Sequence, residues 1–257
     1  MKLSPLWITG FVDGGKCFRL EASPPCFTCR VDRRSADVAY AMKKFFRCGR
    51  VRLLEGDSLE YIESNPQHLE KYLLPFFERY PLLTEQRHSF LEFAAKSRGA
   101  QHLALPTTPR PPQPSEDWFR GMVDAQAHFS LERWGDTYHP VFLLPVGGDG
   151  VLADGIHSLM RCGVRSGAER GLQMIRVSSL VDLEEKLFPF FETRGSKVLL
   201  RTIKRIAYQK FRRIVRIRLQ GRDTSERGGE RQERLIADLN KINNLSAQPP
   251  CCAPFSF

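Results

Sequence analysis

The chain has 257 residues, of which 42% are hydrophobic and 26% are charged, enough apolar material for one large core or two smaller ones. Its 39 Lys and Arg residues outnumber its 29 Asp and Glu residues, and the formal net charge of +10 favours a phosphate-bearing partner over an anionic membrane or an acidic protein. No apolar run approaches the length of a membrane span, and seven cysteines in a chain this long do not indicate a disulfide scaffold.

The first predicted helix begins at Ser4 and Pro5, a favourable N-cap and first-turn pair, and it ends at Gly14 and Gly15. Alternating and amphipathic patterns then predict strand, strand, helix, strand, strand and helix, so that the first half reads αββαββα. These segments are, in order, residues 17–21, 26–31, 35–46, 50–54, 59–63 and 68–80.

The opening segment recurs later in the chain. WITGFVDGGKCFRLE at 7–21 returns as WFRGMVDAQAHFSLE at 118–132, with Trp, Gly, Val, Asp, Phe, Leu and Glu in register. A Cys-Gly pair and a PFFE segment also recur, and their spacing requires an insertion of three residues between the first two strands of the second half. A repeat period above 100 residues predicts two homologous half-domains related by a pseudo-two-fold axis.

A segment that breaks regular structure separates the two halves. Residues 98–117 contain five prolines after Leu103, which favours an extended spacer. Residues 221–234 are polar, charged and contain glycine, which predicts a flexible arm that orders on a partner. We therefore divide the chain into a first repeat at 1–98, a Pro-rich linker at 99–115, a second repeat at 116–218, and a charged arm, short helix and tail at 219–257.

The repeated W-x-x-G-x-V-D opening, the Cys-Gly before a strand and the L-x-P-F-F-E helix together resemble the LAGLIDADG homing endonucleases and maturases in their single-chain, two-repeat form. The likeness extends over about residues 3–211. It implies an α/β (α+β) fold in which two αββαββα half-domains form a saddle with a concave antiparallel β-surface that holds nucleic acid. It also implies that Gly10 and Gly121 lie where two helices touch, and that Asp13 and Asp124 are mainly structural.

In active members of that family, the residue two positions after this Asp is an acid, and the two acids hold a divalent metal against the scissile phosphates. Here these positions are Gly15 and Gln126, and Lys16 adds a positive charge beside the first. The resemblance therefore predicts a pseudo-endonuclease that is not an enzyme, with no catalytic residue, no cofactor and no metal. The CxxC of Cys26 and Cys29 lacks a second pair, and we interpret these residues as buried or free thiols.

Basic residues follow the predicted strands and one predicted helix. Arg50 and Arg52 alternate with apolar residues, which puts both arginines on one face of a strand. Residues 196–222 have the pattern of a basic amphipathic helix, which suits either a solvated face or a phosphate contact. The predicted RNA-binding residues are Lys16, Arg19, Arg30, Arg33, Arg34, Arg50, Arg52, Arg201, Lys204, Arg205, Arg212, Arg213 and Arg216.

An arginine-rich surface without metal ligands suits RNA, since Arg both pairs with phosphate and stacks on bases. We therefore interpret the chain as a non-catalytic RNA-binding protein derived from a homing endonuclease, most simply a component of a mitochondrial ribosome that contacts rRNA and neighbouring ribonucleoprotein subunits. The alternatives are a maturase-like intron splicing cofactor and an active DNA homing endonuclease. A nuclear gene is inferred from the preference for Arg, with a mitochondrial product, or alternatively a chloroplast one, and neither membrane association nor a homo-oligomer is expected.

Overall fold

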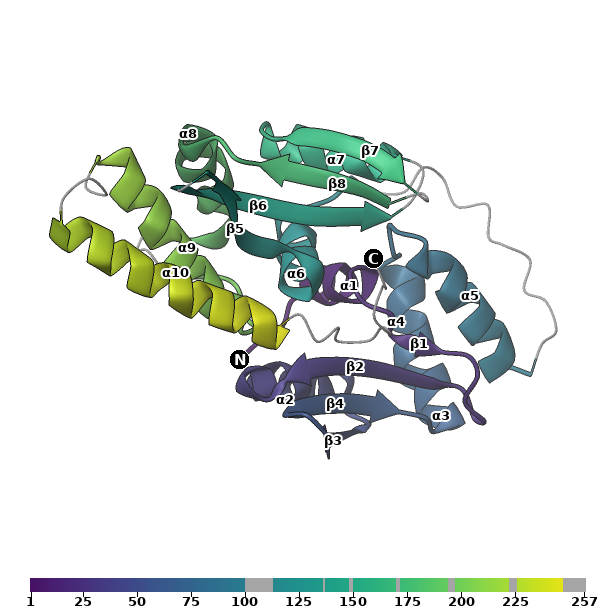
Figure 1. Cartoon of the computed structure of the whole chain (residues 1–257). Helices are drawn as coiled ribbons and strands as arrows, with labels where there is room; N and C mark the ends of the chain where they lie inside the picture. The colour runs from purple at the N-terminus through teal and green to yellow at the C-terminus, as the bar shows by residue number, and fades with distance from the viewer. Residues whose placement is uncertain are drawn as a thin grey trace. The chain divides into compact units, whose positions relative to one another are not determined.

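A computed structural model describes residues 1–99, 113–135, 137–147, 150–169, 172–193, 197–221 and 226–246 (Figure 1). The chain divides into two compact units, one within Met1–Ala125 and the other within Gln126–Gln248. Most of the predicted Pro-rich linker and the end of the predicted tail lie outside the described residues. No helix in the described part of the chain is long and apolar enough to cross a membrane.

The first unit begins with a helix and continues into a four-stranded sheet with helices after it, as the sequence predicts. Its elements are α1 (Pro5–Asp13), β1 (Phe18–Arg19), β2 (Cys26–Asp32), the 3₁₀ turn η1 (Arg33–Ser35), α2 (Ala36–Phe46), β3 (Arg50–Leu54), β4 (Ser58–Glu63), α3 (Pro66–His68), the π-helical turn η2 (Leu69–Leu73), α4 (Leu74–Arg79), α5 (Gln86–Ser97) and α6 (Glu116–Gln126).

The first helix is set by its cap. The Ser4 side chain accepts a hydrogen bond from the backbone nitrogen of Trp7 at 3.1 Å, and Pro5 occupies the first turn. Every residue from Trp7 to Asp13 is buried, so α1 is surrounded by protein along most of its length. A helix buried on all sides suits a position at the centre of a packed unit.

The first sheet is antiparallel with the strand order β1-β2-β4-β3. Because successive side chains of a strand alternate between faces, Phe27 of β2 and Tyr61 of β4 point to one face, where both are fully buried. The aromatic rings of Phe46 and Phe77 pack on Phe27, with centroids 6.1 and 5.5 Å away, and these residues come from α2 and α4. This face is the core, and the opposite face is polar.

One helix of the first unit is missed by the sequence pattern. α5 covers Gln86–Ser97, and its residues Phe90 and Phe93 pack on Phe18 of β1 with ring centroids 5.6 and 5.3 Å away. Tertiary contacts to aromatic residues therefore stabilise this helix more than its own amphipathic pattern does. The sequence pattern that predicts αββαββα for the first repeat omits α5 for this reason.

The second unit repeats the topology, with strand order β5-β6-β8-β7. The ring of Phe129 lies at the centre of its core, with the centroids of Phe142, Tyr208 and Phe211 all within 5.5 Å. The predicted fold class of two similar half-domains with antiparallel sheets is thus confirmed. The elements are β5 (His128–Trp134), β6 (Thr137–Gly147), α7 (Val151–Met160), β7 (Val164–Glu169), β8 (Leu172–Val177), α8 (Leu180–Asp182), the π-helical turn η3 (Leu183–Leu187), the 3₁₀ turn η4 (Phe188–Phe191), α9 (Lys204–Leu219) and α10 (Glu226–Ser246).

The strand register corrects the size of the insertion in the second repeat. Phe18 pairs with Phe27 across β1 and β2, and Phe129 pairs with Phe142 across β5 and β6. The second hairpin therefore contains four extra residues, and α7 with 10 residues is one residue shorter than α2 with 11. The distance in sequence between matching motifs shows only the net difference of three residues. It cannot separate an insertion of four residues from a deletion of one.

The predicted flexible arm is wrong from Glu226 onward. α10 runs from Glu226 to Ser246 and lies beside α9 (Figure 1). Its apolar residues Leu235, Ile236, Leu239 and Ile242 are buried. The first residues of α10 are polar and gave no helical signal. The apolar residues that follow recur at helical spacing, and their burial orders the helix.

Candidate nucleic-acid interface

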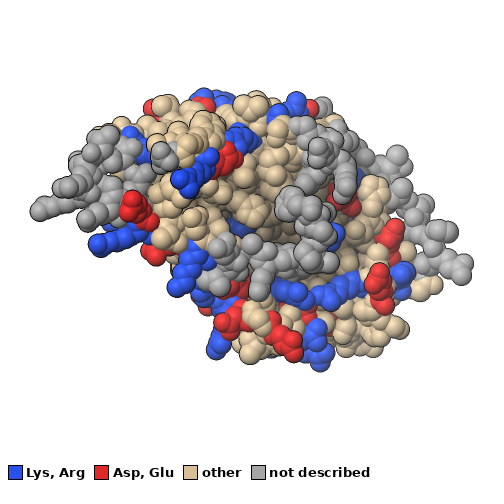
Figure 2. Space-filling model, in the orientation of Figure 1, with Lys and Arg blue, Asp and Glu red and all other residues tan. Residues whose placement is uncertain are grey.

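The polar face of the first sheet gathers arginine side chains. The register places Arg30 of β2 and Arg52 of β3 on either side of Glu60 of β4, and Arg50 lies two residues from Arg52 on the same face. Arg19 of β1 reaches the same group. Figure 2 shows Lys and Arg side chains in a row at this part of the first unit, in the region of β1 and β2. The face is therefore strongly cationic.

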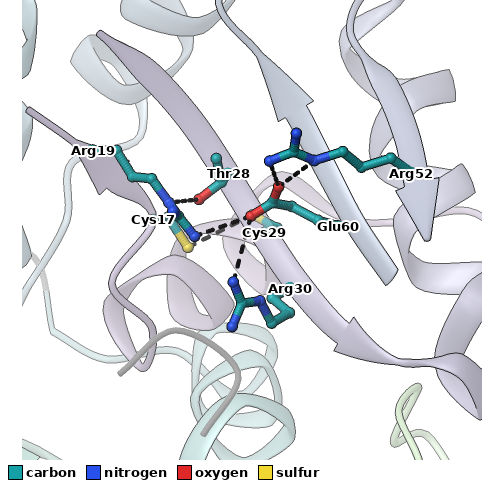
Figure 3. Close-up of polar contacts among 7 residues, drawn as sticks. All are labelled: Cys17, Arg19, Thr28, Cys29, Arg30, Arg52 and Glu60. Carbon is teal, nitrogen blue, oxygen red and sulfur yellow. Dashed lines mark hydrogen bonds and ion pairs between the residues drawn. The ribbon is translucent and has the colours of Figure 1, made fainter. Parts of the chain in front are cut away.

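Glu60 organises three of these arginines (Figure 3). Its Oε2 accepts a hydrogen bond from Nε of Arg52 at 2.8 Å, and Nη2 of Arg52 is 2.6 Å away. Its Oε1 accepts a hydrogen bond from Nη2 of Arg19 at 3.1 Å and lies 4.0 Å from Nη2 of Arg30. Arg19 is also fixed by a 3.2 Å hydrogen bond from Nε to Oγ1 of Thr28. We call Glu60, Arg19, Arg30 and Arg52 the Glu60 cluster.

The Glu60 cluster combines a buried anion with exposed cations. The Glu60 side chain has no exposed surface, whereas 42% of Arg19, 33% of Arg30 and 47% of Arg52 is exposed. One carboxylate offsets one of three guanidinium charges, so the cluster retains a net positive charge. Since each guanidinium carries five N–H donors in a plane, the donors that do not bond Glu60 remain able to bind a phosphate or a base edge.

The polar face of the second sheet has a different character. Arg176 of β8 donates two hydrogen bonds to Glu132 of β5, one of them 2.6 Å from Nη2 to Oε2, and these bonds hold the pKa of Glu132 below its usual value. Trp134 is 55% exposed and stacks on His139 with 4.5 Å between ring centroids. This face therefore offers an exposed aromatic surface beside a neutralised ion pair.

Two glycines allow α1 and α6 to pack in direct backbone contact. A Cβ atom added at Gly10 would lie 1.9 Å from the carbonyl oxygen of Trp118, and one added at Gly121 would lie 2.1 Å from the carbonyl oxygen of Trp7. No side chain fits at such distances. The glycine positions in the two repeats thus occupy equivalent places in the helix contact.

Reciprocal hydrogen bonds join the same helices. Nε1 of Trp7 donates to Oδ2 of Asp124 at 3.0 Å, and Nε1 of Trp118 donates to Oδ2 of Asp13 at 2.8 Å. Asp13 also accepts bonds from the backbone nitrogens of Leu83 and Thr84 and from the Thr84 hydroxyl, the last at 2.6 Å. Burial raises the pKa of Asp13, and these hydrogen bonds oppose that rise. Both oxygens of this carboxylate are therefore engaged in holding the fold.

The residues that follow each helix carry no carboxylate. Gly15 lies just after α1, where an added Cβ would meet Sγ of Cys17 at 3.3 Å. Gln126 is the last residue of α6, and its Nε2 donates to the carbonyl oxygen of Pro145 at 2.5 Å. Lys16 is exposed in the loop after α1. Lys204 at the start of α9 donates from Nζ to the carbonyl oxygen of Ala127 at 2.6 Å.

Two further predicted contact residues lie off the sheet. Arg33 and Arg34 belong to η1, the turn that follows β2. Arg34 makes hydrogen bonds of 2.9 Å from Nε and Nη2 to the two carboxylate oxygens of Asp32, and Nη1 of Arg33 lies 3.3 Å from Oδ1 of Asp57. Each arginine is thus paired with a neighbouring acid and stands apart from the Glu60 cluster.

The basic amphipathic helix is present as α9, but much of its charge is neutralised by acids. Nη1 of Arg212 lies 2.6 Å from Oε1 of Glu192, and Nε of Arg216 donates to Oε1 of Glu184 at 2.8 Å. Of the other predicted residues in this region, Arg205 and Arg213 are exposed on α9 and Arg201 precedes the helix. The charge run therefore serves partly to fix α9 within the second unit.

Glu60 was not among the predicted site residues, and Cys26 and Cys29 of the CxxC segment were predicted only as buried or free thiols. Glu60 alternates with the apolar residues Leu59 and Tyr61, which is a signal that it shares a face with Arg50 and Arg52. Cys26 and Cys29 are three residues apart on one strand, so their side chains point to opposite faces. Sγ of Cys29 lies 3.6 Å from Sγ of Cys17 instead.

Comparison with known proteins agrees with this geometry. Residues 8–96 match the model of a family described as LAGLIDADG endonuclease. No curated protein matches the chain.

Solved structures of DNA-bound endonucleases share the fold. I-SmaMI bound to an uncleaved DNA target with calcium ions aligns with a TM-score of 0.72 and 20% identity, over 93% of this chain and 99% of that one. I-SmaMI bound to cleaved DNA gives 0.72 and 20%, over 94% and 98%. The LAGLIDADG meganuclease I-CpaMI bound to uncleaved DNA gives 0.72 and 14%, over 93% and 100%.

These matches overturn the interpretation as a mitochondrial ribosomal protein. The proteins that share the fold are endonucleases with DNA targets, and none of the matches described above points to rRNA or to ribonucleoprotein subunits as a partner. The preference for RNA rested on the ability of Arg to pair with phosphate and stack on bases, and Arg binds the phosphates of DNA as well. The DNA endonuclease alternative agrees better with these findings, whereas the loss of cleavage stays a prediction.

Proposed function

We propose that this chain binds double-stranded DNA through the polar face of its first sheet; the match of residues 8–96 to the LAGLIDADG endonuclease model and the fold shared with DNA-bound endonucleases support the proposal. The observation that carries this proposal is the Glu60 cluster. It presents guanidinium groups that are already held in position, which lowers the entropic cost of ordering them on a ligand.

The shape of the first sheet suits a duplex groove. β3 is the edge strand and pairs only with β4, so the two strands form a ribbon that carries Arg50 and Arg52 on one face. A two-stranded ribbon fits the major groove, where Arg reads guanine through a bidentate contact. Arg50 is exposed and makes no ion pair within the described residues, which leaves its guanidinium open to phosphate or base.

The family's metal-assisted cleavage does not fit the residues present at the two helix ends. Gly15 has no side chain, and Gln126 offers only a neutral oxygen on an amide whose nitrogen is bonded to Pro145. Asp13 is occupied by the bonds described above, and Asp124 accepts the indole N–H of Trp7. Hard divalent cations need anionic oxygen ligands. We therefore infer that the chain binds DNA without metal-dependent scission at these positions.

DNA cleavage is the second candidate. The family match and the fold shared with an endonuclease bound to cleaved DNA favour it. It would require carboxylates elsewhere in the chain to hold the metal, because Gly15 and Gln126 at the helix ends have none.

The binding proposal is tested by selection from a random double-stranded DNA library, followed by fluorescence anisotropy on the selected duplex at several salt concentrations. Arg52→Ala should weaken binding and reduce the slope of log affinity against log salt by about 1 if the lost contact is to phosphate. Arg33→Ala is the matched control, because Arg33 is an exposed arginine off the sheet, and its effect should be small. Failure to select any duplex, or equal effects of the two substitutions, would contradict the proposal.

Cleavage is tested separately on a plasmid that carries the selected site. The protein should leave the plasmid supercoiled in the presence of Mg²⁺ or Mn²⁺. Nicking or linearisation that depends on the metal would establish the second candidate. The mitochondrial location predicted from the sequence also stays a prediction, which imaging of a tagged chain tests.

A further inference from the structure

Three side chains with metal-binding atoms meet at one end of the first sheet. Cys48 lies two residues before β3, Glu63 is the last residue of β4, and His68 is the last residue of α3. Their ligand atoms all lie within 4.8 Å of one another, and Nδ1 of His68 is 3.0 Å from Oε2 of Glu63. We propose that Cys48, Glu63 and His68 bind one zinc ion.

The ligand types select zinc over the alkaline-earth ions. Thiolate, imidazole and carboxylate together are a common zinc set, whereas Mg²⁺ and Ca²⁺ prefer oxygen ligands alone. Zinc bonds of about 2.0 to 2.3 Å put tetrahedral ligand atoms roughly 3.5 Å apart. Ligand atoms as far apart as 4.8 Å therefore need to approach by about 1.3 Å. His68 can make that movement, because 44% of its side chain is exposed.

Neighbouring groups hold the ligands in place. Oε1 of Glu63 accepts hydrogen bonds from the backbone nitrogens of Ser64 at 2.9 Å and Asn65 at 2.8 Å, which leaves Oε2 directed at His68. The hydroxyl of the buried Tyr61 donates to the carbonyl oxygen of Cys48 at 3.2 Å and fixes the backbone there. Groups that orient metal ligands in this way strengthen a site.

The site is reachable from solvent. An open depression is lined by Glu63, His68 and the residues between them, together with Gly49, Arg50 and Ile62. An ion can reach Glu63 and His68 through this depression, and the buried Cys48 directly precedes its lining residue Gly49. A water molecule can complete four-coordination, as in zinc sites with three protein ligands.

The second repeat lacks the full set of ligands. Cys162 lies two residues before β7, and the last residues of β8 and α8 are Val177 and Asp182. The buried cysteine is therefore common to both repeats, whereas Val177 stands in place of Glu63 and Asp182 in place of His68, so the second repeat has no imidazole at this place. This difference provides a control thiol in an equivalent environment.

Bound zinc would join the start of β3 to the end of β4 and to α3. The joined segment lies directly beside Arg50, at the edge of the proposed DNA-binding face. The metal would thus stabilise that edge, and zinc binding does not depend on whether the chain binds DNA.

The test uses the full chain, stripped of metal with a chelator under reducing conditions and then titrated with Zn²⁺ or Co²⁺. We expect one zinc per chain by elemental analysis and, with Co²⁺, the visible bands of tetrahedral coordination together with a thiolate charge-transfer band. At zinc concentrations 100 times the Kd, the Tm should rise by about 5 °C or more.

Variants separate a real site from a surface ion pair. His68→Gln changes a half-exposed residue and should weaken zinc binding more than about 10-fold, and Cys48→Ala should remove the charge-transfer band. Cys162→Ala should retain both the zinc and the spectrum. If Cys48→Ala fails to fold, His68→Gln decides. Substoichiometric zinc in the wild-type chain, or zinc binding unaffected by His68→Gln, would overturn the proposal and leave an ion pair between His68 and Glu63.

Discussion

The contact between α1 and α6 gives a prediction whose size follows from the coordinates. In Gly10→Ala, the new Cβ would start 1.9 Å from the carbonyl oxygen of Trp118 and 2.8 Å from its carbonyl carbon. Atoms of these kinds do not approach within 3.0 Å, so the helices must separate by about 1 Å or more. The partners are backbone atoms of a buried helix and cannot rotate away.

The expected cost combines three effects. Overpacking of a tight core costs about 1 to 3 kcal/mol. Separation of the helices also stretches the bonds from Trp7 to Asp124 and from Trp118 to Asp13, and buried bonds to a charged group contribute about 1.5 to 3 kcal/mol each. The higher helix propensity of Ala returns about 1 kcal/mol. We expect the free energy of unfolding to fall by about 3 kcal/mol.

Urea unfolding followed by tryptophan fluorescence measures this change, since Trp7 and Trp118 lie in the contact itself. Leu6→Ala is the control, because Leu6 is on the same helix but 41% exposed, and its effect should stay within about 0.5 kcal/mol. The Gly10→Ala and Gly121→Ala costs should not add in the double variant, since one separation relieves both clashes. If Gly10→Ala unfolds at the same urea concentration as the wild type, α1 and α6 do not pack in direct backbone contact at Gly10.

Three further predictions concern charge. Glu60→Gln should lower the free energy of unfolding by about 1 to 2 kcal/mol, which is less than the loss expected for a fully buried pair, because the arginines are partly hydrated. The same substitution removes a negative charge and should raise the affinity for non-specific duplex DNA. Unchanged denaturation and anisotropy curves would contradict this prediction. Because Arg176 lowers the pKa of Glu132, their pairing stabilises the fold above the usual Glu pKa and is lost as the pH falls through the lowered one; Glu132→Gln should therefore flatten the acid side of a plot of Tm against pH, and an unchanged plot would refute the pairing. The double variant Gly15→Asp and Gln126→Asp should introduce metal-dependent nicking of a plasmid carrying the selected site. If this variant binds Mg²⁺ no better than the wild type, carboxylates at these two positions do not form a metal site.

Local patterns predicted most of the fold. The cap at Ser4, the alternating strands and the repeat all act over a few residues or through direct sequence similarity, so they are visible without coordinates. α5 was not predicted, and α10 was predicted only as a short helix after a charged arm, because tertiary contacts order both helices, through Phe90 and Phe93 in α5 and through Leu239 and its apolar neighbours in α10. Propensity alone does not reveal such contacts.

The candidate site was only partly predictable. Alternation correctly put Arg50 and Arg52 on one face, but the arrangement around Glu60 depends on the register between three strands. Arg212 and Arg216 lie on a basic helix in the sequence, yet their partners Glu192 and Glu184 are 20 and 32 positions away. Charge neutralised by distant residues cannot be recognised from a local run.

The nature of the partner was the least predictable feature. Positive charge indicates a phosphate-bearing partner, and both DNA and RNA carry phosphate. Proteins distinguish the two nucleic acids by groove shape and by the 2′-hydroxyl of the sugar. The endonuclease family matched by residues 8–96 and the fold shared with DNA-bound endonucleases favour DNA, a preference that composition alone does not give.

The most direct measurement is an equilibrium competition between the selected DNA duplex and an RNA duplex of the same sequence for the wild-type protein at physiological salt. The DNA duplex should displace the RNA duplex with at least about 10-fold higher affinity, and Arg52→Ala should lower the affinity for DNA. Equal or tighter binding of the RNA duplex would contradict the proposal.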